Sequence, residues 1–595
     1  MDIRNWKPAC ANDVWKFMST LRKTIPLQQR NHFIYINYLL YLRNKYDKEN
    51  ILSLAQLLEK KFSNQQTNLE YILKDHVSEQ LWNTIKEKVE FVSNNILETI
   101  ILDTTGEYLN TAKTPFEHTG NYTPDTLAAL AVSLLDIKEN EAVYDICGGI
   151  GNFTVKAFLQ QPKASYYSKE ISTEAISIME IRQDVLMQNC SSGKINAEIG
   201  NVFDLFETNN TDKAKHFDKV FGNYPWMIDI DCNYSDGNQF LQKIERDVIG
   251  ICNKGISDWI FNFFMLHMMK DSGKAIGIMT NGSTWNQVSG CRNARKYFLE
   301  NGLIEAVIAL PSRIFKETSI TTTLIVFSHG NKKVRMIDAT HLCVEKMRQN
   351  VFTDENIAAI LKAYKEDSDY SILVSVKDIL EKNDTVIHPK RYLVKKVPVK
   401  NGKPLRDVLK EVYRGAAISA KELDRLLTDK PSEYQYIMLK QINDGIIDEN
   451  LPYLSELDKK YEKFIAPNHS VIISKIGTPF KCAVIDVNPE RKILVNGNMF
   501  ILKVDEAKIN PYYLKALFES TYGTALLSNI CIGSIIPALN KKALEELEIP
   551  LPSLEKQNKI ANNYLAIQDE IKIYRMKLTN ALEKKIHIFD EMQGE

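Results

Sequence analysis

The stretch EAVYDICGGIGNF (residues 141–153) decides the fold of the central part of this chain. An apolar strand runs into a glycine-rich turn, and TVKAFL continues with the pattern of a helix. Such a turn lets the backbone approach a ligand closely, and the start of the next helix favours the negative end of a bound molecule. No Gly-Lys-Ser/Thr follows, so this turn is not a phosphate loop. The stretch therefore predicts a ligand site at the end of a strand.

Three more strand ends follow in order. About twenty residues further on, Glu170 ends a strand, where an acidic side chain can accept both ribose hydroxyls of an adenosyl group. In EIGNVFDLF (198–206), Asn201, or alternatively Asp204, can bond an adenine ring; an ordinary turn asparagine is the other interpretation. FDKVFGNYPW (217–226) ends the fourth strand. This order predicts a doubly wound α/β sheet with its ligands at the carboxyl ends of the strands.

The residues Asn223, Tyr224, Pro225 and Trp226 have the chemistry of a pocket for one nucleobase. An exocyclic amine is a poor nucleophile because its lone pair is delocalised into the ring. The side-chain oxygen of Asn223 and the backbone carbonyl of Tyr224 can hold its two protons and direct the lone pair at a methyl donor. Trp226 can stack on a base turned out of the duplex. A strand-ending turn with a buried tryptophan is the alternative interpretation.

The four residues resemble the Asn-Pro-Pro-aromatic signature of DNA adenine methyltransferases, except that Tyr224 stands where the first proline is expected. The glycine turn is similar to the Asp-x-x-x-Gly-x-Gly-x-Phe loop that holds S-adenosylmethionine in that family. GNYTPDTLAAL (120–130) resembles the element that begins the cofactor pocket, and we expect Thr123 to be a helix N-cap with Pro124 in the first turn. The resemblance implies a cofactor site of Tyr122, Thr123, Pro124, Asp145, Gly149, Gly151, Asn152, Phe153, Glu170 and Asn201, without a metal.

The run up to residues 387–393 resembles the modification subunit of type I restriction–modification systems, segment by segment. Residues 257–283 predict a long amphipathic helix, a glycine-containing turn and a buried strand; residues 295–330 predict helix, strand, loop and strand. Residues 1–115 have mostly helical patterns, as expected for the helical domain of those subunits. We therefore expect an N-terminal helical domain (1–115) and a class I methyltransferase domain (116–397).

Beyond residue 398 the chain resembles one target-recognition domain of a type I specificity subunit (398–554), of α/β type, followed by a helical tail (555–595). The stretch 549–557 is the most characteristic part. Lys475, Lys481 and Lys541 are candidates for contacts with DNA phosphates, or else solvated surface lysines. Apolar residues recur in the tail at steps of four and three, which predicts a seam against another helix, either of the same domain or of a second copy of the chain. These residues are Ile560, Tyr564, Ile567, Ile571, Tyr574, Leu578, Leu582, Ile586 and Phe589.

The composition is that of a globular protein: 595 residues, 44% hydrophobic, 25% charged, with a formal net charge of zero. Neutrality argues mildly against a DNA-binding protein, although phosphate contacts need only a basic groove. Nine scattered cysteines without a C-x-x-C pair indicate neither zinc nor disulfides, and no signal peptide or membrane span is visible, so we expect a cytoplasmic protein.

The expected function is methylation of adenine N6 in double-stranded DNA. A homodimer joined through the tail is expected, and a separate restriction subunit is left open as a partner. Two rivals remain: a catalytically weakened protein that binds DNA and S-adenosylmethionine, and a methyltransferase for RNA or protein.

Overall fold

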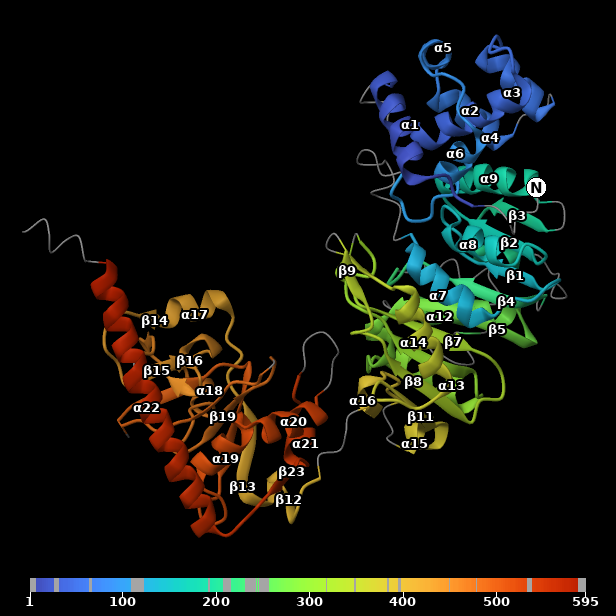
Figure 1. The fold of residues 1–595 in the computed structure, drawn as a ribbon. Helices are drawn as coiled ribbons and strands as arrows, with labels where there is room; N and C mark the ends of the chain where they lie inside the picture. Colours follow the sequence, from blue (N-terminus) through green and yellow to red (C-terminus); the bar gives the residue numbers. More distant parts are fainter. Residues whose placement is uncertain are drawn as a thin grey trace, which may run out of the picture. The chain divides into compact units, whose positions relative to one another are not determined.

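The computed structural model describes residues 7–25, 32–63, 67–108, 122–190, 193–206, 216–228, 256–316, 318–346, 349–381, 385–393, 398–448, 450–477, 479–488, 490–531 and 538–586, together with residues 230, 242 and 244. The chain divides into two compact units, Met1–Leu393 and Val394–Glu595. Figure 1 shows both. The division lies four residues before the boundary predicted at 397/398, and the boundary predicted near residue 115 falls outside the described residues.

The first unit begins with helices, as the sequence predicts. They are α1 (Ala11–Thr24), α2 (Phe33–Tyr46), α3 (Leu54–Phe62), α4 (Asn68–His76), α5 (Glu79–Lys88) and α6 (Asn94–Ile101). The side chains of Ser53, Thr67 and Ser78 accept backbone N–H groups at the starts of α3, α4 and α5, which satisfies donors that have no partner inside a helix. Helix α2 is buried from Phe33 to Asn44, so it forms the centre of this helical segment.

A nine-stranded sheet follows, in the order β11-β8-β6-β7-β5-β4-β1-β2-β3. Its strands are β1 (Ala142–Asp145), β2 (Ser165–Glu170), β3 (Lys194–Ile199), β4 (Phe217–Gly222), β5 (Met269–Thr280), β6 (Ile304–Ala309), β7 (Thr322–Phe327), β8 (Lys333–Asp338) and β11 (Ser371–Ser375). Strand β1 pairs in parallel with both β2 and β4, whereas β7 runs antiparallel to β5 and β6.

The chain fills one side of β1 with β2 and β3 and then crosses to β4 on the other side. Ligands of open α/β sheets bind where the strand order reverses in this way, outside the carboxyl ends of the strands. The predicted doubly wound sheet is confirmed, and its reversal point lies between the ends of β1 and β4. The helices α7 (Asp125–Leu135), α8 (Asn152–Gln160), α9 (Thr173–Gln188), α12 (Ser257–Met268), α13 (Ser289–Glu300) and α14 (Asp354–Lys365) accompany the sheet.

Two expectations for residues 257–283 are wrong. Helix α12 is not amphipathic, because every residue except His267 is buried. No turn separates α12 from the next strand either, since β5 begins at Met269 and runs through Gly273. The pairs Phe217–Met269 and Lys219–Lys274 leave residues 270–273 of β5 opposite the single residue Asp218, so the expected glycine-containing turn is a bulge within the strand. A helix buried all round lacks the periodic polar face from which amphipathicity is read.

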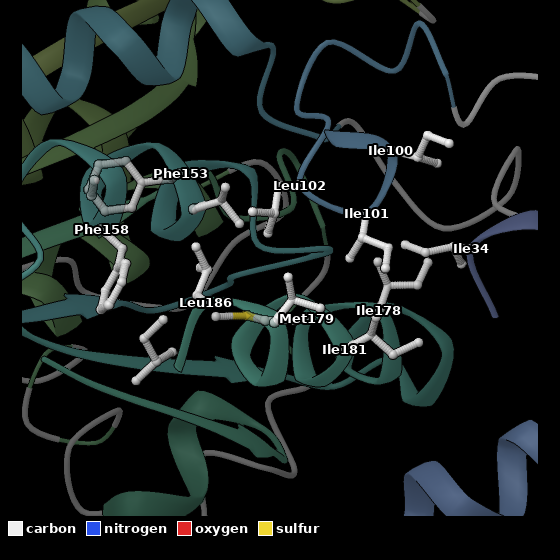
Figure 2. Close-up of a cluster of buried hydrophobic side chains, with 14 of the residues drawn as sticks. Ile34, Ile100, Ile101, Leu102, Phe153, Phe158, Ile178, Met179, Ile181 and Leu186 are labelled. Carbon is white, nitrogen blue, oxygen red and sulfur yellow. The ribbon is translucent and has the colours of Figure 1, made fainter. Parts of the chain in front are cut away.

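The helical segment and the sheet share one hydrophobic core through α9. Figure 2 shows part of it, where Ile34 and Ile101 of the helical segment approach Ile178 and Met179 of α9. Three tyrosine hydroxyls of α2 also bond to α9: Tyr35 to Ser177 Oγ at 2.9 Å, Tyr38 to Asp184 Oδ2 at 2.9 Å and Tyr41 to Gln188 Oε1 at 3.1 Å. Helix α9 therefore belongs structurally to both segments.

The second unit contains two four-stranded sheets, with the orders β13-β22-β19-β20 and β14-β18-β15-β21. The first is formed by β13 (Leu409–Arg414), β22 (Met499–Val504), β19 (Val471–Ser474) and β20 (Cys482–Val484). The second is formed by β14 (Leu427–Thr428), β18 (Tyr453–Leu454), β15 (Tyr434–Ile437) and β21 (Lys492–Val495). Helices such as α19 (Pro511–Glu519) complete the expected α/β unit.

The predicted tail is a single helix, α22 (Leu554–Ile586), which packs along its own unit. Gln557 and Ala561 are buried, Tyr564 donates to Glu519, and Lys515 Nζ donates to Gln568 Oε1 at 2.8 Å. Tyr564, predicted as part of the seam, therefore contacts its own domain. The other seam residues within the described chain are 39–75% exposed: Ile560, Ile567, Ile571, Tyr574, Leu578, Leu582 and Ile586. Phe589 lies outside the described residues.

Within the described ranges, no helix combines the length and the apolar character that crossing a membrane requires.

Candidate active site at the carboxyl edge of the sheet

The glycine turn after β1 is shaped for close backbone approach. Gly149 has φ +53° and Gly151 has φ +84°, conformations that glycine adopts without strain. A Cβ at Gly151 would lie 3.0 Å from Met179 Cγ, and one at Gly149 would lie 3.3 Å from Tyr122 Cδ1. The predicted residue Tyr122 thus lines this turn. A side chain at either glycine would press against Met179 or Tyr122, so glycine lets this turn, hereafter the cradle, pack tightly.

Asp145 ends β1 and is buried, with 2% of its surface exposed. Its Oδ2 accepts a hydrogen bond from Thr154 Oγ1 at 3.2 Å, while Oδ1 is buried without a hydrogen-bond partner among the described residues. Burial raises the pKa of Asp145 to about 8; the bond from Thr154 lowers it and the nearby charge of Glu170 raises it. A carboxyl group with an unsatisfied buried oxygen fits a ligand that brings a hydrogen-bond donor or a positive charge.

Glu170 lies at the end of β2, as predicted, and its carboxylate holds the cradle together. Oε2 accepts from the backbone nitrogen of Gly149 at 2.8 Å, and Oε1 accepts from those of Ile171 and Ser172 at 2.9 Å each. Ser172 then caps the start of α9. The acidic residue therefore fastens the glycine turn to the first turn of α9, a role that the sequence did not reveal.

Asn201 follows β3 and bonds locally. Its Oδ1 accepts from the backbone nitrogen of Phe203 at 3.1 Å, and its own backbone nitrogen donates to Asp204 Oδ2 at 3.2 Å. These are the bonds of a turn asparagine, one of the two interpretations drawn from the sequence. A contact with an adenine ring stays a prediction.

The expected N-cap role of Thr123 is wrong. Helix α7 begins at Asp125, Pro124 occupies the cap position, and no side chain caps the helix. Thr123 Oγ1 instead accepts a hydrogen bond from Asn223 Nδ2 at 3.1 Å, and its backbone oxygen accepts from Asn152 Nδ2 at 2.8 Å. A residue before proline favours extended backbone, which places Thr123 one step before the cap. The structure thus joins the predicted cofactor element directly to Asn223.

Tyr224, the departure from the family pattern, points into the core and is 1% exposed. Its ring stacks on Phe261 with centroids 4.8 Å apart and an interplanar angle of 5°, and its hydroxyl donates to Asn262 Oδ1 at 2.8 Å. Phe261 and Asn262 belong to α12. Only the backbone of Tyr224 is therefore left for the site, beside the half-buried Asn223 and the exposed Pro225.

The ring of Trp226 is fixed by one hydrogen bond and one edge-on aromatic contact. Its Nε1 donates to the backbone oxygen of Ile278 at 2.9 Å, and its ring meets Phe315 edge-on with centroids 4.8 Å apart. The next residue, Met227, donates its backbone N–H to Asp258 Oδ1 at 3.2 Å. Trp226 is only partly buried, so part of its surface reaches solvent. Sequence reasoning missed Phe315 and Asp258, whose places depend on the folded sheet.

Asp258 fixes the loop after Trp226 to the end of β5. It is fully buried, and its Oδ2 accepts from Thr280 N at 2.9 Å, Thr280 Oγ1 at 2.8 Å and Ser283 Oγ at 3.0 Å. Asp258 and Asn262 lie one turn apart on α12. One face of α12 thus holds both ends of the segment Tyr224–Met227.

The three lysines predicted near phosphates lie in the second unit. Lys481 Nζ donates to the backbone oxygens of Leu439 at 2.8 Å and Ile442 at 2.7 Å, so its ammonium group stabilises its own domain. Lys541 forms an ion pair with Glu545 at 3.7 Å. Lys475 bonds through its backbone to Asn498 and Leu539. Phosphate contacts stay predictions, with the least support for Lys481.

Within the described ranges, no group of three or more His, Cys, Asp or Glu side chains is arranged to hold a metal ion.

Two family models match the chain. Residues 107–399 match the family described as N-6 DNA Methylase, and residues 403–584 match the type I restriction modification DNA specificity domain. The change from the first match to the second, between residues 399 and 403, lies within ten residues of the division between the two units.

Curated relatives are similar to one part or the other. The type I restriction enzyme MjaVIII methylase subunit of Methanocaldococcus jannaschii is 25% identical over 296 residues, covering 46% of this chain and 49% of that protein. A putative type I restriction enzyme MjaX specificity subunit of the same organism is 28% identical over 167 residues, covering 26% and 36%. The chain thus spans about half the length of the methylase subunit. Among solved structures, a type I methyltransferase subunit from Streptococcus thermophilus has a TM-score of 0.45 at 20% identity, covering 64% of this chain and 98% of that one.

Proposed function

We propose that this chain, which joins a domain of the N-6 DNA methylase family to a type I DNA specificity domain, methylates the N6 amine of adenine in double-stranded DNA. The observation that carries the proposal is the bond between Thr123 and Asn223, which sets the predicted amine acceptor beside the predicted cofactor site at the sheet's reversal point. The specificity domain favours DNA over RNA or protein as the substrate.

The first unit has a cradle that suits S-adenosylmethionine. Asp145 offers a buried oxygen, Gly149 and Gly151 adopt positive φ angles that keep the turn tight against Tyr122 and Met179, and Glu170 ends β2 where ribose hydroxyls are expected. Tyr122, Pro124, Asn152 and Phe153 stay in the proposed site; Tyr122 lies beside Gly149, whereas the ring of Phe153 is 1% exposed and stacks on Phe221 in the core. When bound there, the cofactor supplies an electrophilic methyl group.

The chain's own residues position the amine. Asn223 Oδ1 and the carbonyl of Tyr224 accept its two protons, so the nitrogen lone pair is directed at the methyl group. Asn223 donates its Nδ2 to Thr123, which fixes the plane of the amide and leaves Oδ1 as the side-chain acceptor. An amide is not a strong base, so positioning and hydrogen bonding account for the rate, and the proton leaves afterwards. Trp226 presents its partly exposed ring to the base.

Incubation with methyl-labelled cofactor and separate pools of DNA, RNA and protein tests the proposal. We expect label in DNA alone, as N6-methyladenine after digestion, and none with Asn223→Ala. Label in RNA or protein would support a methyltransferase for one of those substrates. A wild-type chain that binds S-adenosylmethionine and DNA but transfers no methyl group would support a catalytically weakened protein.

We also propose that the DNA-bound form is a homodimer joined through α22. One face of α22, including the seam residue Tyr564, contacts its own unit, whereas the other described seam residues are 39–75% exposed. A specificity domain of this size reads a short half-site, and each base contributes only about 1–3 kcal/mol of discrimination. Two copies related by a twofold axis would read a palindromic motif with an unread gap.

Ile571→Glu with Leu578→Glu tests the dimer without removing the buried residues of α22. We expect a monomer in sedimentation and loss of specific methylation. Lys559→Glu, an exposed change on α22 outside the seam, is the control for added negative charge. A double variant that sediments and methylates like the parent would contradict the dimer. A separate restriction subunit stays a further candidate partner, which co-purification from the native cell would test.

A further inference from the structure

A buried arginine of α9 connects the helical segment to the cofactor cradle. Arg182 is 1% exposed. Its Nε donates to the backbone oxygen of Ile101 at 3.0 Å, and one terminal nitrogen donates to the oxygen of Ile150 at 2.7 Å and to Asn152 Oδ1 at 2.8 Å. The other terminal nitrogen donates to the oxygen of Asp103. Two acceptors therefore belong to the end of the helical segment and two to the glycine turn.

The hydrogen bonds continue from Arg182 to the residue proposed to hold the amine. Asn152, which accepts from Arg182, donates its Nδ2 to the backbone oxygen of Thr123 at 2.8 Å. Thr123 in turn accepts from Asn223 Nδ2 at 3.1 Å. The links form an unbroken series from residues 101–103 to Asn223, and each of them is at least partly buried.

Packing holds α9 in place around the arginine. Met179, one turn before Arg182, lies 3.0 Å from where a Cβ of Gly151 would be, so the same helix face supports both sides of the turn. Figure 2 shows Met179 beside Ile178 and Ile101, within the core shared by the two segments. A guanidinium group spreads its donors in a rigid plane, which suits four acceptors in different directions; an ammonium group has only three donors around one point.

We propose that Arg182 is a positioning residue that holds the cofactor turn against the end of the helical segment and, through Asn152 and Thr123, sets the orientation of Asn223. Residues 101–103 are then part of the wall of the cofactor site. This inference rests on the proposed function. Without the guanidinium, the oxygen of Ile150 and Asn152 Oδ1 lose their donor, and the turn is free to shift away from the ligand.

The test compares two buried arginines. Arg182→Lys keeps the charge but loses the planar set of donors. Arg295→Lys is the matched control, because Arg295 is also fully buried and donates to three backbone oxygens, of Thr385 at 2.9 Å, Ser283 at 2.9 Å and Asn286 at 2.7 Å, without touching the cofactor turn. Calorimetry with S-adenosylmethionine should show a Kd about tenfold higher in Arg182→Lys, the effect of a lost buried hydrogen bond. Arg295→Lys should keep the wild-type Kd despite a similar loss of Tm.

Two further readouts separate positioning from stability. Hydrogen exchange without cofactor should show lost protection at residues 101–104 and 148–152 in Arg182→Lys, but not in Arg295→Lys. Thr123→Val removes the hydroxyl that accepts from Asn223 at the far end of the series, so it should lower kcat even at saturating S-adenosylmethionine. KM for DNA should stay at the wild-type value in Arg182→Lys.

The outcomes are distinct. A wild-type chain that does not bind S-adenosylmethionine would refute the proposed function itself. Wild-type binding together with an unchanged Kd and normal exchange in Arg182→Lys would overturn the role of Arg182. An equal rise of Kd in the Arg295→Lys control would also overturn it, since the effect would then follow from lost stability alone. If Arg182→Lys does not fold, Thr123→Val becomes the deciding test. An unchanged kcat in Thr123→Val would overturn the proposal that the hydrogen bonds from Arg182 to Asn223 orient Asn223.

Discussion

Replacing Tyr224 by proline restores the residue that the family pattern expects, yet we predict that it harms this protein. The tyrosine ring is fully buried against Phe261, and its hydroxyl is bonded to Asn262. Removing a buried aromatic ring costs about 3–5 kcal/mol, because the remaining side chains fill the space only in part. A proline gives back about 0.4–1 kcal/mol by restricting the unfolded chain. The net prediction is a loss of roughly 2–4 kcal/mol in the free energy of unfolding of the first unit.

Urea unfolding followed by tryptophan fluorescence measures this loss, and single-turnover methyl transfer measures its effect on the site. Tyr224→Phe keeps the ring and should cost only about 1–3 kcal/mol, the penalty for leaving Asn262 Oδ1 without its donor. Tyr166→Phe is the matched control, since Tyr166 is equally buried but bonds to Ala157 and Gln161, away from the loop. It should lose stability without losing rate at saturating cofactor. A Tyr224→Pro variant as stable and as active as the parent would refute the reasoning.

Three further predictions concern the cofactor cradle and the base pocket. Gly151→Val should raise the Kd for S-adenosylmethionine at least about tenfold in calorimetry, because a side chain there is strained at φ +84° and meets Met179. Asp145→Asn should flatten the pH dependence of stability. Burial raises the pKa of Asp145 to about 8, so the folded protein keeps a proton that the unfolded chain loses near pH 4, and the free energy of unfolding should fall as pH rises from about 4 to 8. An equal slope in parent and variant in urea titrations would contradict this. Trp226→Ala should weaken capture of an extrahelical adenine by about 1–3 kcal/mol, measured as DNA affinity with an abasic-site control, while cofactor affinity stays unchanged.

The sheet could be predicted from the sequence because the residues that mark each strand end lie next to that strand in the chain. The glycine turn, Glu170 and Asn223 each end a strand, and the rule that ligands meet at the carboxyl ends of parallel strands brings them together. The same reasoning failed for α12, where apolar residues on every side hide the helical period, and for Gly273, which lies inside a strand instead of a turn. Local patterns report burial only when one face of an element stays polar.

Hydrogen bonds between residues far apart in the chain could not be predicted from local sequence patterns. The bond from Asn223 to Thr123 spans 100 positions, and the bond from Arg182 to Ile101 spans 81. Nothing near Thr123 distinguishes a capping hydroxyl from one that accepts an amide, because the Thr-Pro pair fits both. Likewise, nothing in the sequence around Lys481 predicts that its ammonium group donates to two backbone carbonyls of its own domain.

The structure also bears on whether Tyr224 weakens the site. The argument for weakening is that tyrosine lacks the ring that fixes φ in proline. Here, however, the segment is held by side chains instead: Tyr224 by Asn262 and Phe261, Trp226 by the oxygen of Ile278, and Met227 by Asp258. Three of these four partners belong to α12, and Ile278 belongs to β5, the strand that follows it. A loop anchored at three of its four residues keeps the carbonyl of Tyr224 in place without the proline, so the loss of the proline is compatible with an active enzyme.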